Sequence, residues 1–238
     1  HISGLNQLSL NHQKNVQLLG FDEEQRRKML LNSESLDLSY CNIWTYQDEE
    51  EEDLVLEHYQ NYFDGVFVLN ISYNLISKVE TVQKIIKRFS NLQTLIMNGL
   101  RFSNYVLTCS LFPRALKRLS LSNHQTCDVL HLLPENHMFE VLDLSNNNLG
   151  ELQQSGILEE YLNLSTFHSV ELNLSFNDLH FVPHISNTAK HLNISNNQIT
   201  QRMNAKAQKR AYRNVLSLNI ESNKVSHWDD LFELVMVI

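Results

Sequence analysis

Apolar positions recur in one short pattern along most of this chain. An apolar residue is followed, after two others, by a pair of aliphatic residues on alternate positions, and three residues later by a position that is usually asparagine. In the clearest copy these residues are Phe139, Leu142, Leu144 and Asn147, with Leu149 after them. Alternation with period two predicts a short β-strand whose two aliphatic side chains point into a core.

The pattern occurs eight times, so we expect eight short strands joined by return segments. We call the usual asparagine position the ladder position. Its spacing of 20 to 33 residues fits one strand and one return segment per turn. One such turn cannot bury its own leucines, so neighbouring turns must stack around a shared interior. The strand pairs are Leu36/Leu38, Leu69/Ile71, Leu95/Met97, Leu119/Leu121, Leu142/Leu144, Leu172/Leu174, Leu192/Ile194 and Leu218/Ile220, and the ladder residues are Cys41, Asn74, Leu100, His124, Asn147, Asn177, Asn197 and Asn223.

The whole pattern resembles the leucine-rich repeat signature. The resemblance implies an α/β fold, a horseshoe-shaped solenoid of about eight repeats with a parallel sheet on the concave side and a mixed helical and irregular convex side. We expect residues 1–31 to form a lead-in that caps the apolar interior and residues 32–238 to form one solenoid. Because the chain begins with His1 and has no signal segment at its start, we expect an excised fragment.

Asparagine suits the ladder position because its side-chain amide both donates and accepts hydrogen bonds and can tie adjacent turns together. Cys41 is a common substitute at this position. Leu100 and His124 depart from the pattern, so we expect a looser or rearranged ladder there.

The return segments differ in length. Residues 54–63, 79–89 and 205–213 are long enough for helices, and the second has apolar residues at helical spacing. The ladder steps of 23 and 20 residues leave less room, so short turns or extended chain are expected there, as at residues 180–183.

Composition and charge narrow the class of partner. The chain has 238 residues, of which 42% are hydrophobic, and no stretch approaches the roughly 20 apolar residues that cross a bilayer, so we expect no membrane partner. The net charge of −8 argues against binding to nucleic acid. The acidic run Asp48 to Asp53 is either a solvated loop or a surface that attracts a basic partner. The basic side chains Lys206, Lys209, Arg210 and Arg213 are either a solvated helix face or, if a partner binds the outer surface, the pole of that surface opposite to the acidic run.

Cysteine usage and glycosylation sequons point to different compartments. Three scattered cysteines do not form the paired end caps of extracellular repeat proteins, which favours a reducing compartment. Sequons start at Asn70, Asn163, Asn173 and Asn193, and all but Asn163 lie in strands where the repeat itself prefers asparagine and serine.

We expect no catalysis, cofactor, metal or small-molecule substrate. The six glycines are too dispersed for a phosphate-binding loop. Cys109 and Cys127 lie too far apart for a structural zinc site, and Pro183 between His180 and His184 argues against a metal-binding helix.

Binding is expected on the concave face, where side chains that alternate with the buried pairs point outward. Eight strands at roughly 4.8 Å spacing give a face about 34 Å wide, which suits a protein partner. Tyr40, Tyr73 and Phe176 are the outward aromatic residues, either interface anchors or edge packing. Alanine at Tyr40 and Tyr73 together should weaken capture of a partner. The candidate partner-binding residues are Asp37, Tyr40, Asn70, Tyr73, Asp143, Asn173, Phe176 and Asn193.

Two stretches resemble one family more closely. The lead-in residues 14–22 resemble the segment that opens the repeat domain of tubulin-folding cofactor E. Residues 73–77 and 223–230 are similar to that family's repeats, in which a tryptophan and acidic residues begin the helix after the ladder asparagine. The resemblance implies a cytoplasmic, cytoskeleton-associated chaperone module that holds α-tubulin during heterodimer assembly and disassembly.

Two other functions remain open on the sequence. An extracellular or lumenal recognition receptor would carry glycans at Asn70 and Asn173 and would depend on oxidation. A cytosolic scaffold or regulatory subunit would share the fold and the reducing compartment.

Overall fold

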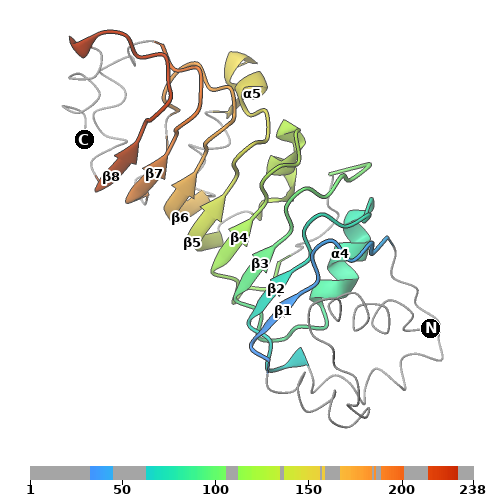
Figure 1. Cartoon of the computed structure of the whole chain (residues 1–238). Coiled ribbons are helices and arrows are strands. Elements are labelled where there is room, and N and C mark those ends of the chain that lie inside the picture. Colours follow the sequence, from blue (N-terminus) through green and yellow to red (C-terminus); the bar gives the residue numbers. More distant parts are fainter. Residues whose placement is uncertain are drawn as a thin grey trace, which may run out of the picture. The chain divides into compact units, whose positions relative to one another are not determined.

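The computed structural model of the protein describes residues 33–44, 63–105, 112–134, 137–155, 157–158, 167–183, 185, 189–200 and 214–229. The chain divides into two compact units, His1–Leu116 and Lys117–Ile238. Eight parallel strands follow one another in chain order, three in the first unit and five in the second (Figure 1). The expected α/β fold with parallel strands is therefore confirmed.

The first unit contains β1 (Ser35–Asp37), β2 (Val68–Asn70) and β3 (Thr94–Ile96), with helix α4 (Val79–Ile86) on the return path between β2 and β3. Leu36, Leu69 and Leu95 are in register across these strands. The side chains of Leu69 and Leu95 are fully buried, and so are those of Ile71 and Met97, the second members of their pairs.

The second unit contains β4 (Arg118–Ser120), β5 (His137–Asp143), β6 (Phe167–Asn173), β7 (His191–Asn193) and β8 (Ser217–Asn219). Their first inward leucines also form one row in register. Leu142 and Leu144 are buried, whereas Leu218 in β8, which pairs only with β7 among the described strands, is half-buried. The predicted inward pairs thus form the core of each unit.

The strands are short because the chain bends at both of their ends. At the start of β2, two successive amides, those of Phe67 and Val68, donate to the carbonyl of Glu34 at 2.8 and 3.0 Å. Leu216 and Ser217 make the same pair of bonds to the carbonyl of Lys190 at 2.7 and 3.0 Å. Each of these strands therefore begins at a bend in the backbone, where one carbonyl of the preceding turn accepts hydrogen bonds from two successive amides.

The ladder asparagines behave as predicted. The side-chain Oδ1 of Asn147 accepts the amide of His124 at 2.9 Å, and its Nδ2 donates to the carbonyls of Leu121 and Leu144 at 2.7 and 3.0 Å. Asn74 and Asn197 each make the equivalent bonds to the preceding turn and to their own turn. Each carboxamide therefore replaces solvent for backbone groups of two turns at once.

The two exceptional ladder positions differ from each other. Leu100 is fully buried and cannot make these bonds, and the turns there are tied instead by the amide of Asn98, which donates to Ser72 Oγ at 3.0 Å, and by Ser103, whose amide and hydroxyl donate to the carbonyl of Ser77 at 2.9 and 3.1 Å. The ladder is therefore rearranged at Leu100, as expected. At His124 the backbone amide keeps its bond to the next asparagine.

The predicted helix at residues 79–89 is confirmed as α4, which ends at Ile86 and lies to one side of the three strands (Figure 1). The return after His124, expected to be a turn or extended chain, instead contains the 3-10 helix η2 (Cys127–Leu132). Helix α5 (Gly150–Ser155) is a further short helix that the sequence did not predict. Residues 180–183 form neither helix nor strand, as expected.

Several predicted features fall outside the described residues. These are the lead-in at residues 1–31, the acidic run Asp48 to Asp53, the return segments at 54–62 and 205–213, and the sequon at Asn163.

Candidate protein-binding surfaces

The residues between the two inward positions form a continuous outward row in each unit. In the first unit Asp37, Asn70 and Ile96 are in register on neighbouring strands. In the second unit the row is Ser120, Asp143, Asn173, Asn193 and Asn219. Because side chains alternate along a strand, these residues lie on the face opposite the buried leucines. Five of the eight candidate partner-binding residues lie in these two rows, namely Asp37, Asn70, Asp143, Asn173 and Asn193.

Asparagine and aspartate at the row positions also end the strands. In each case Oδ1 accepts the backbone amide two residues later, at 2.9 Å for Asp37, 3.1 Å for Asn70 and 3.0 Å for Asp143. Asn173, Asn193 and Asn219 make the same bond at 3.2, 3.1 and 3.0 Å. This Asx turn orients the side chain, so the polar row is held in place before any partner arrives.

Neighbouring side chains of the second row are also bonded to one another. The hydroxyl of Ser120 donates to Asp143 Oδ2 at 3.1 Å, and Asn173 Nδ2 donates to Asp143 Oδ1 at 2.9 Å. Asp143 is thus the centre of a three-residue network that crosses three strands. The sequence did not predict this network, because it depends on the strand register.

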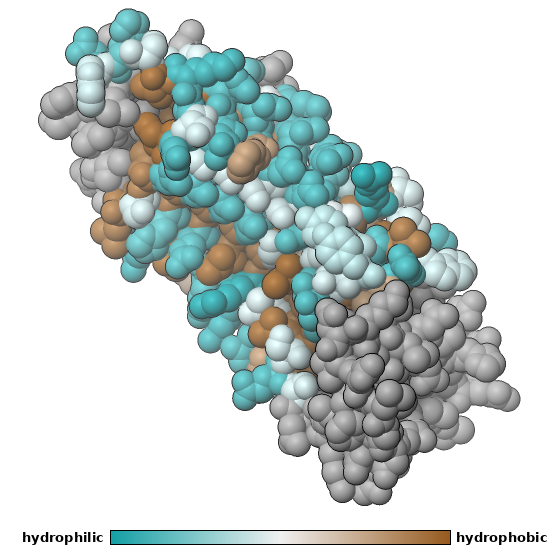
Figure 2. Space-filling model, in the orientation of Figure 1, coloured by the Kyte–Doolittle hydropathy of each residue, from teal (hydrophilic) through white to brown (hydrophobic). Residues whose placement is uncertain are grey.

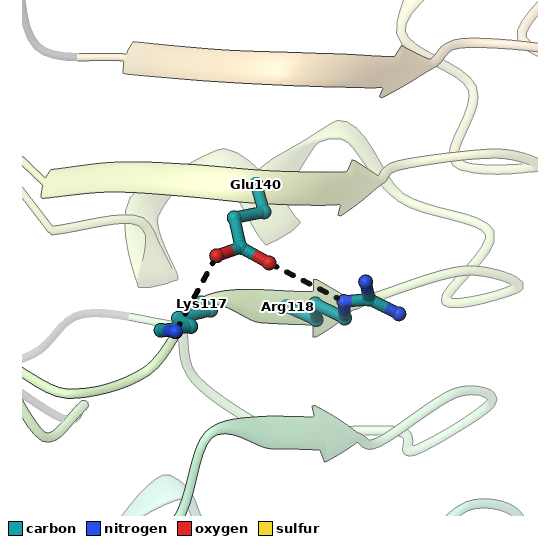
Figure 3. Close-up of polar contacts among 3 residues, drawn as sticks. All are labelled: Lys117, Arg118 and Glu140. Atoms are coloured by element: carbon teal, nitrogen blue, oxygen red, sulfur yellow. Dashed lines mark ion pairs between the residues drawn. The ribbon is translucent and has the colours of Figure 1, made fainter.

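Charged side chains lie close to this row, at the start of β4 and in the middle of β5. Glu140 reaches towards the preceding strand and pairs with Lys117 Nζ at 3.5 Å and with Arg118 Nε at 3.7 Å (Figure 3). All three side chains are about half exposed or more, so the pairs contribute little to stability. They balance charge locally and leave the row itself mostly neutral and hydrogen-bonding.

The position just before the ladder residue has left-handed backbone geometry in all eight turns. Its φ angle is 56° at Tyr40, 55° at Tyr73, 63° at Gly99 and 56° at Phe176. The other occupants are Asn123, Asn146, Asn196 and Ser222, with φ between 54° and 60°. This position lies in the turn that follows each strand, beyond the end of the strand itself. The three aromatic candidates therefore each lie just beyond the C-terminal end of a strand.

The aromatic residues of the first unit are arranged as a stack. The rings of Tyr40 and Tyr73 have centroids 4.7 Å apart and are 11° from parallel. A Cβ at Gly99, the equivalent residue of the next turn, would overlap the ring of Tyr73. The tyrosine ring thus occupies space that only a glycine leaves free. In the second unit Phe176 is 57% exposed.

Two exposed apolar residues lie in the same two turns as this stack. Trp44 and Leu75 are 66% and 62% exposed, and the amide of Leu75 donates to the carbonyl of Ile43 at 2.7 Å, which places their turns side by side. On the side drawn in Figure 2, hydrophilic residues cover most of the described surface and hydrophobic residues occupy smaller areas between them.

The described thiols are not arranged for nucleophilic chemistry. Burial raises the pKa of the Cys41 thiol, and the nearby Asp37 carboxylate raises it further. Burial likewise raises the pKa of Cys127, with Asp128 and Glu151 adding to the effect. Both thiols therefore favour the protonated form, whereas a reactive cysteine needs the thiolate.

Among the residues that the structure describes, no group of three or more histidine, cysteine or acidic side chains is placed to hold a metal ion. In the same part of the chain no helix is long and apolar enough to cross a membrane. No protein-family model matches the chain, and none of the curated proteins matches it either.

Proposed function

We propose that this chain is a non-catalytic protein-binding module, a leucine-rich repeat solenoid of about eight repeats with a horseshoe shape. We further propose that it is similar to the repeat domain of tubulin-folding cofactor E and binds α-tubulin during assembly and disassembly of the tubulin heterodimer. Its setting would be the reducing cytoplasm, in association with the cytoskeleton. The tubulin assignment comes from the resemblance of residues 14–22, 73–77 and 223–230 to that family.

The observation that best supports protein binding is the polar row of the second unit. Five outward side chains stand in register on five adjacent strands, and Asx turns and the network around Asp143 orient them. At roughly 4.8 Å per strand the row extends about 19 Å, a length that matches a protein surface better than a metabolite. Side chains that are already ordered lose little entropy on binding, which favours affinity.

The proposal is tested with purified tubulin heterodimer and the immobilised chain in reducing buffer. The variant His191→Arg/Asn193→Arg places two arginines on the outward face of β7, where both wild-type side chains are at least partly exposed. We expect it to weaken tubulin binding by at least about tenfold, or about 1.4 kcal/mol.

A matched control carries the same change in charge outside the row. Thr200→Arg/Ser226→Arg substitutes two exposed residues of the same unit, so it should bind tubulin as the wild type does. The control should melt close to the wild type, and the row variant, which loses the bond from the Ser195 amide to Asn193 Oδ1, should melt only slightly lower and remain folded. Failure of the wild type to retain tubulin would refute the tubulin assignment, and equal binding by both variants would remove the row from the interface.

The receptor alternative predicts glycans at Asn70 and Asn173, whereas our proposal predicts none at Asn173. In the structure the Oδ1 atoms of Asn70, Asn173 and Asn193 are committed to Asx turns, and Asn173 Nδ2 is bonded to Asp143. Secretory expression followed by mass spectrometry should therefore find no glycan at Asn173. A glycan there, with loss of folding in reducing buffer, would favour the receptor.

A further inference from the structure

In the first unit, the turns that follow β1 and β2 carry an exposed aromatic surface that is separate from the polar row. We call it the tyrosine platform and define it as Tyr40, Trp44, Tyr73 and Leu75. The amide of Tyr40 donates to the carbonyl of Ser72 at 3.1 Å and that of Leu75 to the carbonyl of Ile43 at 2.7 Å, so the two turns run side by side. All four side chains are at least 36% exposed.

The backbone at this position does not favour tyrosine. A left-handed conformation is readily adopted by glycine and tolerated by asparagine, whereas a bulky side chain is uncommon there. The chain itself places asparagine at three of the eight equivalent positions and glycine at one. Asparagine at residues 40 and 73 would therefore adopt the required backbone conformation more readily than tyrosine does. Strained residues that persist on a surface point to a functional role.

The geometry of the stack leaves one aromatic face open. Tyr73 covers one face of Tyr40, and the ring of Tyr73 in turn lies over Gly99. Tyr40 is nevertheless 68% exposed, so its other face is accessible. A flat ligand group could extend the stack on that side.

Charge identifies the group that fits. The strands β1 and β2 and the turns that follow them, residues 35–44 and 68–77, contain Asp37 and no lysine, arginine or histidine. Asp37 is the last residue of β1 and Tyr40 lies three residues later, in the turn that begins with the Asx bond of Asp37 Oδ1. A planar cation is favoured both by the electron-rich ring face and by the negative charge of Asp37.

We propose that the tyrosine platform binds an arginine-bearing segment of a partner protein, whose guanidinium stacks on the open face of Tyr40 while apolar neighbours contact Trp44 and Leu75. This inference rests on the proposed function as a protein-binding module and specifies the chemistry of one of its contacts. Lysine fits less well, because its ammonium cannot stack.

The test uses two fluorescein-labelled peptides of equal charge, hexa-arginine and hexa-lysine, and measures their affinities by fluorescence anisotropy at about 0.15 M salt, where long-range attraction is largely screened. The two peptides carry equal charge, so their difference reports contacts that only a guanidinium can make, and the variants below separate stacking on Tyr40 from pairing with the acidic run Asp48 to Asp53. We expect the wild type to bind hexa-arginine at least about fivefold more tightly than hexa-lysine. Equal affinities would overturn the proposal.

Three variants locate the preference. Tyr40→Asn/Tyr73→Asn introduces the residue that the chain uses at equivalent turns, so it should fold normally and lose the preference for arginine. Gly99→Ala should reduce the preference as well, because its Cβ displaces the ring of Tyr73. Phe176→Asn makes the matched substitution in the second unit and should leave the preference intact. An unchanged preference in the double variant, or an equal loss in Phe176→Asn, would overturn the proposal.

Two further measurements distinguish an arginine-bearing partner from a second copy of this chain and from tubulin itself. If sedimentation showed concentration-dependent dimers that the double variant abolished, a second copy would be the occupant and the arginine proposal would be wrong. A preference for arginine without tubulin binding would support the platform proposal and refute the tubulin assignment. Tubulin binding without a preference for arginine would support the tubulin assignment and refute the platform proposal.

Discussion

The side-chain amide of Asn147 joins backbone groups of two turns inside the core. It is fully buried and bonds to backbone groups at His124, Leu121 and Leu144. We expect Asn147→Ala to lower the free energy of unfolding by about 1–3 kcal/mol, because these groups lose their partners without gaining water. Urea denaturation measures the loss.

Asn219→Ala is the matched control for this substitution. Asn219 is exposed, and its Oδ1 accepts the amide of Glu221 at 3.0 Å. Its replacement should cost clearly less, since water can take over the released amide. Equal midpoints for Asn147→Ala and the wild type would contradict the role of the ladder carboxamide.

The thiol of Cys41 gives stability a dependence on pH in the alkaline range. It is buried at its ladder position and its Sγ donates to the carbonyl of Ser39 at 3.4 Å. Burial, and then Asp37, raise its pKa above the unfolded value of 9.0. Its contribution is therefore fully present below pH 9.0 and is lost as pH rises towards the folded-state pKa, because the unfolded chain releases the proton first.

The variant Cys41→Ala tests this dependence. Alanine does not titrate, so the stability advantage of the wild type over the variant, measured by urea denaturation, should shrink between about pH 7 and about pH 10. A constant or growing difference over this range would show that the thiol is not held in its protonated form.

Single residues could be assigned from the sequence where the pattern repeats, and not where it depends on neighbours. The inward leucines, the ladder asparagines and the outward rows follow from alternation and spacing alone. Trp44, Leu75 and the Ser120–Asp143–Asn173 network depend on which turns lie side by side, which the spacing does not encode. The left-handed backbone geometry at Tyr40 and Tyr73 could not be predicted from the sequence, because tyrosine seldom adopts it.

Helix α5 depends on close contact between its first residue and the following turn. Gly150 is buried, its amide donates to the carbonyl of Asn177 at 2.8 Å, and a Cβ there would overlap the carbonyl of Asp178. Gly150→Ala should therefore cost about 1–3 kcal/mol, because backbone atoms cannot move aside as a flexible side chain can. Thermal denaturation gives the shift in Tm.

Glu151→Ala is the control on the same helix. Glu151 is exposed in the first turn of α5, so its loss should change stability by no more than about 0.5 kcal/mol. If Gly150→Ala had the same Tm as Glu151→Ala, helix α5 would not be packed against residues 177 and 178 as the structure has it.

The short helices show where periodicity fails as a predictor. Helix α4 spans eight residues with apolar side chains at helical spacing, and the sequence predicted it. α5 has only six residues, fewer than two α-helical turns, and η2 is a 3-10 helix, whose three residues per turn do not give the 3.6-residue period. The buried Gln153 of α5, whose Nε2 donates to the carbonyl of Phe181 at 2.7 Å and whose Oε1 accepts the amide of His180 at 2.7 Å, helps to hold that helix through contacts distant in sequence.

Each unit is built by stacking, since its strands pair only with their neighbours in chain order. In such an arrangement stability is a sum of turn and interface terms, and a turn with one described neighbour has fewer of them. In the first unit the amide of Leu38 donates to the carbonyl of Asn70 at 2.7 Å and that of Ile71 to the carbonyl of Ile96 at 2.8 Å. The two amides make the same type of bond at different places in the stack.

Native-state hydrogen exchange can therefore separate hydrogen bonding from position in the stack. Ile71 follows β2, which is paired on both sides, whereas Leu38 follows β1, which is paired on one side among the described strands. The Leu38 amide should exchange at least about tenfold faster than the Ile71 amide, a difference of about 1.4 kcal/mol in opening free energy. Ile194 in the second unit, bonded to the carbonyl of Asn219 at 2.9 Å, provides an internal standard. Equal protection of Leu38 and Ile71 would mean that the outer side of β1 is covered as firmly as the interior, and the expected lead-in at residues 1–31 would be the segment to delete next.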